Sequence, residues 1–129
     1  MTTVSDVLVV GASAAGLATA EALRRLGHRG RLTVLGDERH FPYDRPPLSK
    51  QVLAGTREPE RARLRPEATL AALGADLVLG DAAVDLDPGT RTVHTAAGRV
   101  LRADAVVVAT GLRPRMLPKR CGAWATGAG

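Results

Sequence analysis

Residues 4–35 read VSDVLVVGASAAGLATAEALRRLGHRGRLTVL, and their pattern of apolar residues and glycines predicts the first part of the fold. The nearly continuous apolar run over residues 4–10 is typical of a strand that is buried on both faces of a parallel sheet. Apolar residues at helical spacing then predict a helix over 14–26, which Gly27 ends. Residues 31–35 are expected to form a second strand. Together these segments predict a βαβ unit with two parallel strands. The apolar positions expected on the helix are Leu17, Ala18, Ala22 and Leu26.

After residue 35 the sequence pattern changes twice, first to a polar, proline-containing segment and then to short apolar runs. Residues 36–55 are polar and contain three prolines, which indicates a long loop that is either functional or disordered. A short helix is expected over 66–73. Short strand candidates follow, separated by glycine turns that are close enough for antiparallel hairpins. They lie at 77–79, 83–86, 90–94 and 99–101. Residues 103–109 predict another buried, parallel strand.

These elements predict a doubly wound α/β fold, which is a Rossmann-like domain with a parallel central sheet. A small antiparallel crossover meander is expected over 82–101. The domain is assigned to residues 1–118. Residues 119–129, KRCGAWATGAG, show no periodic pattern and are expected to be an irregular tail.

The turn between the first strand and the helix resembles the dinucleotide fingerprint G-x-G-x-x-G, with Ser13 in place of the middle glycine. Gly11 lets the chain turn sharply, and Gly16 lets the helix pack closely against the sheet. The amides at the start of the helix are suited to binding a diphosphate. The alternative is a plain strand-to-helix turn without a ligand. The candidate phosphate-binding residues are Gly11, Ala12, Ser13, Ala14, Ala15 and Gly16.

An acidic residue that binds the adenosine ribose is expected about 20 residues after this turn. Gly36 stands where the second strand ends, and Asp37 and Glu38 follow directly. We expect Asp37 to bind the ribose because it lies nearer to the strand end. The alternative is that both residues are solvated loop acids.

Composition places the chain among ordinary soluble domains, because 45% of its 129 residues are hydrophobic and 24% are charged. The net charge of +5 comes almost wholly from arginine. It indicates either a face that attracts an acidic partner or a compositional bias spread over the surface. No dense basic run with interleaved aromatic residues suggests nucleic-acid binding.

Several other classes of site and location receive no support from the sequence. The single cysteine, Cys121, excludes an intramolecular disulfide and a cysteine-based metal cluster. His28, His40 and His94 lack metal-ligand spacing, so no metal is expected. The N-terminus is not a signal peptide, and no apolar stretch approaches the length of about 18 residues that a membrane span needs. We therefore expect a cytoplasmic protein without membrane contact.

The most specific motif is FPYDRPPLSK at residues 41–50. Together with VVG at 9–11 and ATGLRPR at 109–115, it resembles the FAD-dependent ferredoxin reductases of oxygenase systems, within the pyridine nucleotide-disulfide oxidoreductase superfamily. The resemblance runs from about Val7 to Pro118. It implies a fold like glutathione reductase, with an FAD domain, an inserted NAD(P)H domain and an interface domain. It also implies electron transfer from NAD(P)H through FAD to a ferredoxin.

The same resemblance implies roles for individual residues. Gly11 to Gly16 would bind the FAD diphosphate and Asp37 the adenosine end. Arg45 and Lys50 would lie beside the diphosphate and the flavin, with Lys50 as the catalytic residue near the reactive edge of the ring. The remaining cofactor-binding residues would be Ala83, which touches adenine through its backbone, and Ala109, Thr110 and Gly111.

The sequence also departs from the family pattern. The second glycine-rich motif, for NAD(P)H, is absent, and so is the interface domain. A truncated or frameshifted reading frame after Pro118 is the expectation, and turnover by this chain alone is not expected. Two alternatives stay open, namely a catalytically inactive nucleotide-binding fragment and an NAD(P)-binding dehydrogenase domain. The particular ferredoxin, the choice of NADH or NADPH, and the oligomeric state also stay open.

Overall fold

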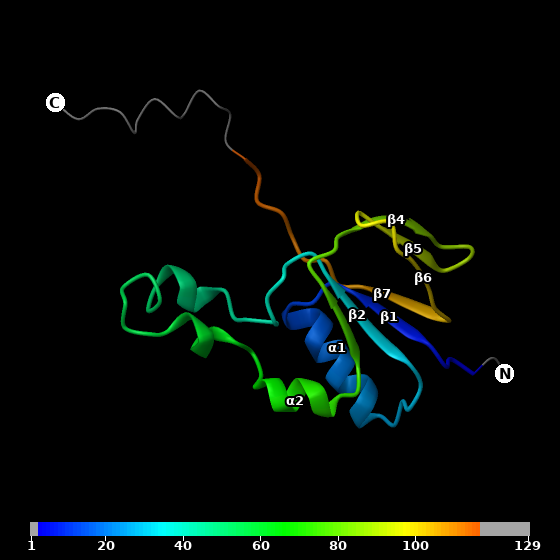
Figure 1. The fold of residues 1–129 in the computed structure, drawn as a ribbon, viewed down its shortest axis with the longest axis horizontal. Helices are drawn as coiled ribbons and strands as arrows, with labels where there is room; N and C mark the ends of the chain where they lie inside the picture. Colours follow the sequence, from blue (N-terminus) through cyan, green and yellow to red (C-terminus); the bar gives the residue numbers. More distant parts are fainter. Residues whose placement is uncertain (1–2, 117–129) are drawn as a thin grey trace.

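The computed structural model describes residues 3–116, which form two sheets and two α-helices (Figure 1). The elements in chain order are β1 (Val7–Val10), α1 (Ala14–Arg25), β2 (Leu32–Gly36), the 3₁₀ turns η1 (Pro46–Ser49) and η2 (Pro59–Ala62), α2 (Glu67–Ala72), β3 (Asp76–Leu79), β4 (Ala83–Asp87), β5 (Thr92–Thr95), β6 (Val100–Arg102) and β7 (Ala105–Val108). The segment that holds η1 and η2 extends away from the sheet, beyond the carboxyl end of β2 (Figure 1, cyan to green).

The larger sheet is entirely parallel, with the strand order β3-β2-β1-β7. Val9 of the central strand β1 is fully buried and lies beside Val34 of β2 and Val107 of β7. The predicted βαβ unit is therefore confirmed. The strand predicted at 103–109 is also parallel, but as β7 it forms an edge of the described sheet, and Val108 is 59% exposed.

The sequence predicts antiparallel hairpin pairing for the strand candidate at 77–79, and this prediction is wrong. That segment is β3, which pairs parallel to β2 with Thr33 beside Asp76 and Leu35 beside Val78. The physical reason is the connection before it, because α2 and the long loop carry the chain back to the starting end of the sheet. Parallel neighbours require a crossover of this kind.

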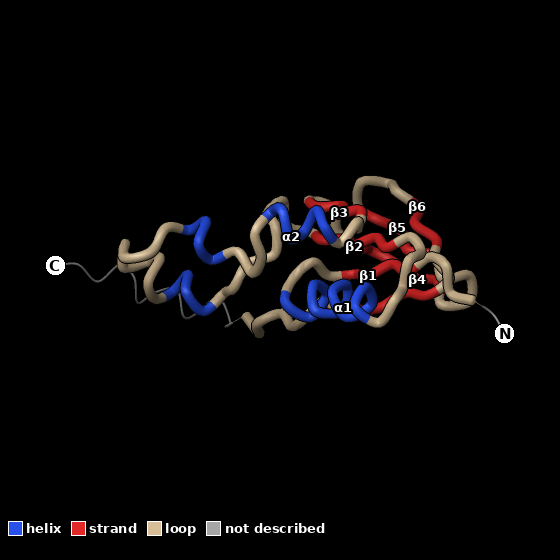
Figure 2. Tube along the Cα trace, turned by 90° about the horizontal axis from the view of Figure 1, so that it is seen from below, coloured by secondary structure: helices blue, strands red, loops and turns tan. Residues whose placement is uncertain are grey.

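The two faces of the parallel sheet are covered by different structures. On one face, α1 packs through Ala20 and Leu23 against Val7 and Val34 (Figure 2). The other face packs against the small antiparallel sheet, with Val93 of β5 in the same apolar cluster as Leu8, Val10 and Leu35. The described residues thus form a helix layer, a parallel sheet and an antiparallel layer, which agrees with the predicted α/β fold of a parallel central sheet and a small meander.

The antiparallel layer is the predicted meander, with strand order β4-β5-β6. Asp81, which lies between β3 and β4, anchors it. Its side chain is 2% exposed and accepts hydrogen bonds from the Ala97 amide at 2.9 Å and the Arg99 guanidinium at 2.6 Å. The Thr95 hydroxyl, the Ala97 amide and Arg99 together hold the pKa of Asp81 below its usual value. A charged carboxylate therefore ties the turn of the meander to the end of the parallel sheet.

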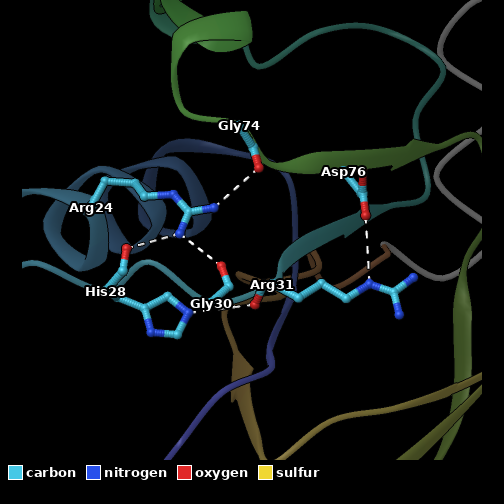
Figure 3. A network of polar contacts seen from close by, with 6 residues as sticks. All are labelled: Arg24, His28, Gly30, Arg31, Gly74 and Asp76. Atoms are coloured by element: carbon cyan, nitrogen blue, oxygen red, sulfur yellow. Dashed lines mark hydrogen bonds and ion pairs between the residues drawn. The ribbon is translucent and has the colours of Figure 1, made fainter.

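Helix α1 differs from the prediction at its C-terminal end. Leu26 was expected on the apolar face, but it is the residue after the helix and is 81% exposed. Arg24 instead turns inward and donates to four backbone carbonyl oxygens, of which those of His28, Gly30 and Gly74 are drawn in Figure 3. Its partners are Leu73 at 2.6 Å, His28 at 2.9 Å, Gly30 at 2.9 Å and Gly74 at 3.1 Å. This side chain therefore joins the end of α1 to the turn between α2 and β3.

Two further points concern the limits of the domain. The tail predicted at 119–129, and the boundary at residue 118, lie outside the described residues. No helix within residues 3–116 has the length and apolar character needed to cross a membrane.

Candidate functional site

The turn between β1 and α1 requires glycine at two positions. Gly11 has a φ of +118°, and a Cβ there would overlap the carbonyl oxygen of Ala109. A Cβ on Gly16 would overlap the carbonyl oxygen of Gly11. The glycines thus let the turn lie directly against the chain that leaves β7, and let α1 lie directly on the turn. This is the close packing that the fingerprint predicts.

The start of α1 presents free backbone donors. Ser13 is the N-cap with extended backbone, and its side chain makes no capping hydrogen bond. The first hydrogen bond of the helix runs from the Leu17 amide to the Ser13 carbonyl, so the amides of Ala14, Ala15 and Gly16 have no partner inside the helix. The first turn contains no acidic residue. These donors and the positive end of the helix dipole suit an anionic group such as a phosphate.

A narrow groove lies beside this turn, at the carboxyl ends of β1, β2 and β7. Its cavity volume is about 60 Å³. Open α/β sheets bind their ligands at this edge. Such a volume accommodates only a small part of a dinucleotide, so the rest would lie along the open surface. The residues that line the groove are Gly11, Ala12, Ser13, Gly36, Asp37, Glu38, His40, Tyr43, Arg45, Ala109 and Thr110.

The structure therefore brings together a large part of the predicted site. The groove joins Gly11, Ala12 and Ser13 with Asp37 and Arg45, and two further predicted residues, Ala109 and Thr110, complete its wall. These come from three segments that are far apart in the sequence, and the parallel sheet places their ends side by side.

Other predicted residues lie outside the groove. Ala14, Ala15 and Gly16 belong to α1 itself, behind the turn. Ala83 is exposed at the start of β4, where it pairs with Thr95 of β5. Gly111 follows the β7 end and is exposed, with a φ of +73°. None of these positions tests the roles that the resemblance implies.

Lys50, the residue expected to be catalytic, also lies outside the groove. It is exposed and stands directly after η1, with its amide donating to the Pro47 carbonyl. It is on the segment that extends beyond the carboxyl end of β2. Pro46 and Pro47 open this 3₁₀ turn and restrict its backbone, as the sequence indicates.

The two adjacent acids at the end of β2 differ in their surroundings. Within residues 3–116, the carboxylate of Asp37 makes no hydrogen bond or ion pair and is exposed to solvent at the groove. Glu38 is half-buried and holds two partners. It accepts from the Tyr43 hydroxyl at 2.6 Å and from the Arg45 guanidinium at 3.0 Å. The hydrogen bond from Tyr43 to the carboxylate raises the pKa of the tyrosine above its ordinary value.

Sequence reasoning missed this contact and a second hollow beside it. The hollow has a volume of about 540 Å³ and shares His40 and Tyr43 with the groove. The segments around it pair with each other, because the Asp44 amide donates to the Ala62 carbonyl and the guanidinium of Arg63 lies over Phe41. The only sequence signal that could have indicated this contact and this hollow was the position of the aromatic residues in the FPYDRPPLSK motif.

The family described as pyridine nucleotide-disulphide oxidoreductase matches residues 5–126, which is nearly the whole chain. The chain belongs to this family. The family resemblance predicted from the sequence is therefore confirmed.

Two relatives show how large a share of a longer protein the chain matches. The chain is 40% identical over 113 residues to the ferredoxin–NAD(+) reductase subunit of the benzene 1,2-dioxygenase system from Pseudomonas putida, covering 88% of this chain and 27% of that protein. It is 37% identical over 118 residues to putidaredoxin reductase from Pseudomonas putida, covering 92% of this chain and 28% of that protein. The chain thus spans about a quarter of the length of these relatives.

Two solved structures share the fold. A putidaredoxin reductase in covalent complex with putidaredoxin superposes with a TM-score of 0.83 at 37% identity, over 88% of this chain and 27% of that one. An NADH:rubredoxin oxidoreductase from Clostridium acetobutylicum has a TM-score of 0.77 at 21% identity, over 87% of this chain and 29% of that one. The predicted Rossmann-like fold with its parallel sheet and antiparallel meander is confirmed.

Proposed function

We propose that the chain is the FAD-binding part of an oxidoreductase that passes electrons from NAD(P)H through FAD to a ferredoxin. The observation that carries the proposal is the groove, in which the glycine turn, Asp37 and Arg45 meet at the carboxyl edge of a parallel sheet. The names of the relatives, which are ferredoxin–NAD(+) and putidaredoxin reductases, support the choice of reaction and partner.

The donors and charges of the groove fit an adenine dinucleotide. The free amides at the start of α1 and the guanidinium of Arg45 would bind the diphosphate. The exposed carboxylate of Asp37 would accept hydrogen bonds from the adenosine ribose, while Glu38 is already engaged. The close approach of backbone that Gly11 and Gly16 allow leaves room for the phosphates against the turn.

Bound FAD would supply the chemistry, which is acceptance of a hydride and delivery of single electrons. We propose that Lys50 lies near the reactive edge of the flavin and stabilises the negative charge of the reduced ring. The backbones of Ala83 and Gly111 would contact the cofactor at its adenine end and where the chain leaves the domain. Residues 1–129 lack a second glycine-rich motif, so turnover with NAD(P)H is proposed for proteins of the length of the relatives.

The charge and the cysteine content of the chain support two further parts of the proposal, namely the partner and the location. The net charge of +5 is consistent with docking an acidic ferredoxin by electrostatic steering. A cytoplasmic location is proposed because a chain with a single cysteine fits a reducing compartment.

Reconstitution with FAD tests the proposal directly. The purified chain is incubated with FAD, free cofactor is removed, and the retained flavin is measured from its visible absorbance. We expect the wild type to retain FAD and Asp37→Asn to bind it about tenfold more weakly, because a charge-assisted contact to the ribose is lost. The matched control Asp85→Asn, an exposed acid on β4, is expected to leave the affinity unchanged.

The same preparation tests Lys50. Lys50→Gln is expected to retain FAD and to lower the reduction potential of the bound flavin, because a cation beside the reduced ring is removed. A folded wild type that retains no flavin, or that retains NAD in preference to FAD, would contradict the proposed function.

A further inference from the structure

Arg45 does not stand alone at the groove. Its guanidinium lies 3.0 Å from one carboxylate oxygen of Glu38, and the other oxygen of Glu38 accepts from the Tyr43 hydroxyl at 2.6 Å. The guanidinium also lies over the ring of Tyr43, 5.9 Å from its centre. The Arg45 side chain is 67% exposed, and within residues 3–116 the polar and cation–π contacts of its guanidinium are with Glu38 and Tyr43. These contacts therefore select its rotamer.

The two partners of Arg45 are themselves fixed by backbone contacts. The Glu38 carbonyl accepts from the Gly80 amide at 3.0 Å, which ties residue 38 to the end of β3. Tyr43 pairs in an antiparallel bridge with Arg63, which holds the loop against the segment that follows η2. The side chain of Glu38 thus joins two separately anchored pieces of backbone, and Arg45 is held where they meet.

We propose that Glu38 is a positioning residue that, with Tyr43, holds the guanidinium of Arg45 at the mouth of the groove for the diphosphate of the cofactor. The inference rests on the proposed function, because it assumes a diphosphate ligand. A long, exposed arginine loses considerable side-chain entropy when it is ordered, so ordering it before the ligand arrives strengthens binding.

Two other roles for Glu38 make different predictions. If Glu38 were a ribose ligand, its oxygens would accept from the ribose beside or in place of Tyr43 and Arg45, whereas within residues 3–116 the adjacent Asp37 has no such partners. If Glu38 were only a neighbouring negative charge, it would repel a diphosphate, and its removal would strengthen binding. A positioning role predicts the opposite sign, because the loss of Arg45 order outweighs the loss of repulsion.

FAD affinity of the wild type and of variants decides between these roles. Tyr43→Phe is the cleanest variant, because it removes one anchor of Glu38 without changing any charge, and we expect FAD to bind about threefold more weakly. Glu38→Ala is expected to weaken binding about fivefold. The matched control Glu58→Ala removes an exposed charge before η2 and is expected to leave the affinity unchanged.

The Arg45→Gln background shows whether the effect passes through the arginine. There, Glu38→Ala and Tyr43→Phe are expected to change the FAD affinity by less than about twofold, because the group that they position is gone. Undiminished effects in this background would overturn the proposal and favour direct contact of Glu38 with the ligand. Stronger FAD binding by Glu38→Ala would also overturn it, in favour of a merely repulsive charge.

A measurement without ligand reports on the same contacts. Tyr43 is the only tyrosine in the chain, so the absorbance of its phenolate follows this one group. Its hydrogen bond to Glu38, partial burial and the negative charges of Glu38 and Asp37 raise its pKa, while Arg45 lowers it. Glu38→Ala is expected to lower the pKa of Tyr43. An unchanged titration would overturn the proposed contact, whereas a wild type that binds no FAD would overturn the proposed function.

Discussion

Replacing Arg24 by alanine should destabilise the domain more than any other single change of an arginine on α1. Arg24 donates four hydrogen bonds to carbonyl oxygens, two in the turn after α1 and two in the turn between α2 and β3. The partners in the second turn lie 49 and 50 residues away in the sequence. Arg24 therefore links two segments that otherwise meet mainly through apolar side chains.

The expected loss follows from the strength of charge-assisted hydrogen bonds. Each contributes about 1.5–3 kcal/mol when it is largely shielded from water. Here the arginine is only half-buried, and the Gly74 contact is exposed, so water replaces part of what is lost. The four contacts also share one side chain and are not additive. We therefore expect Arg24→Ala to lower the free energy of unfolding by about 2–4 kcal/mol.

Urea unfolding of matched variants measures this loss. Arg25→Ala is the control, because Arg25 is the next residue, is exposed, and makes no side-chain hydrogen bond or ion pair within residues 3–116. Its free energy of unfolding should stay within about 0.5 kcal/mol of the wild type. Arg24→Lys should recover only a small part of the stability that Arg24→Ala loses, because an ammonium group cannot reach four carbonyls in two turns. Equal stability of Arg24→Ala and Arg25→Ala would refute the reasoning.

Two further predictions concern the turn and the meander. Gly16→Ala should lower the free energy of unfolding by about 3 kcal/mol, because its Cβ would overlap the Gly11 carbonyl. A Cβ on Gly27 meets no atom within 4 Å, so Gly27→Ala should lower the free energy of unfolding by only about 1 kcal/mol, through backbone strain. Equal losses of stability in thermal unfolding would contradict this prediction. Asp81 has a lowered pKa, so its contribution is present above the ordinary aspartate pKa of about 3.9 and is lost as the pH falls through the lower value of the folded state. The free energy of unfolding of the wild type should fall steeply in that acid range, and that of Asp81→Asn should depend less on pH. The exposed control Asp85→Asn should show the same pH dependence as the wild type.

The local signals in the sequence predicted the first unit of the fold correctly. The apolar run of β1, the helical spacing of α1 and the glycines of the turn each act within a few residues, so they are visible without tertiary structure. The same signals misplaced Leu26, because a helix can end before its apolar pattern does. They also misassigned β3, because a short apolar run does not state which strand it will pair with.

The candidate site shows the same division. Glycine spacing located the candidate phosphate-binding turn, and the acids after β2 followed from their distance along the chain. The contacts of Glu38 were not predictable, because they depend on where the loop after β2 returns and which rotamers it allows. The family resemblance of the FPYDRPPLSK motif marked Arg45 as a candidate cofactor-binding residue, but it did not show which residues hold the arginine in place.

The parallel βαβ unit and the narrow turn that suits a phosphate follow from the sequence alone. Periodicity and the absence of a Cβ are properties of short segments, and they act before any distant contact forms. Three features depend instead on the tertiary structure: a meander covers the second face, Arg24 joins α1 to the turn before β3, and Glu38 is engaged while Asp37 has no side-chain partner within residues 3–116. Those outcomes depend on groups that are distant in the chain and become neighbours only when the sheet is complete.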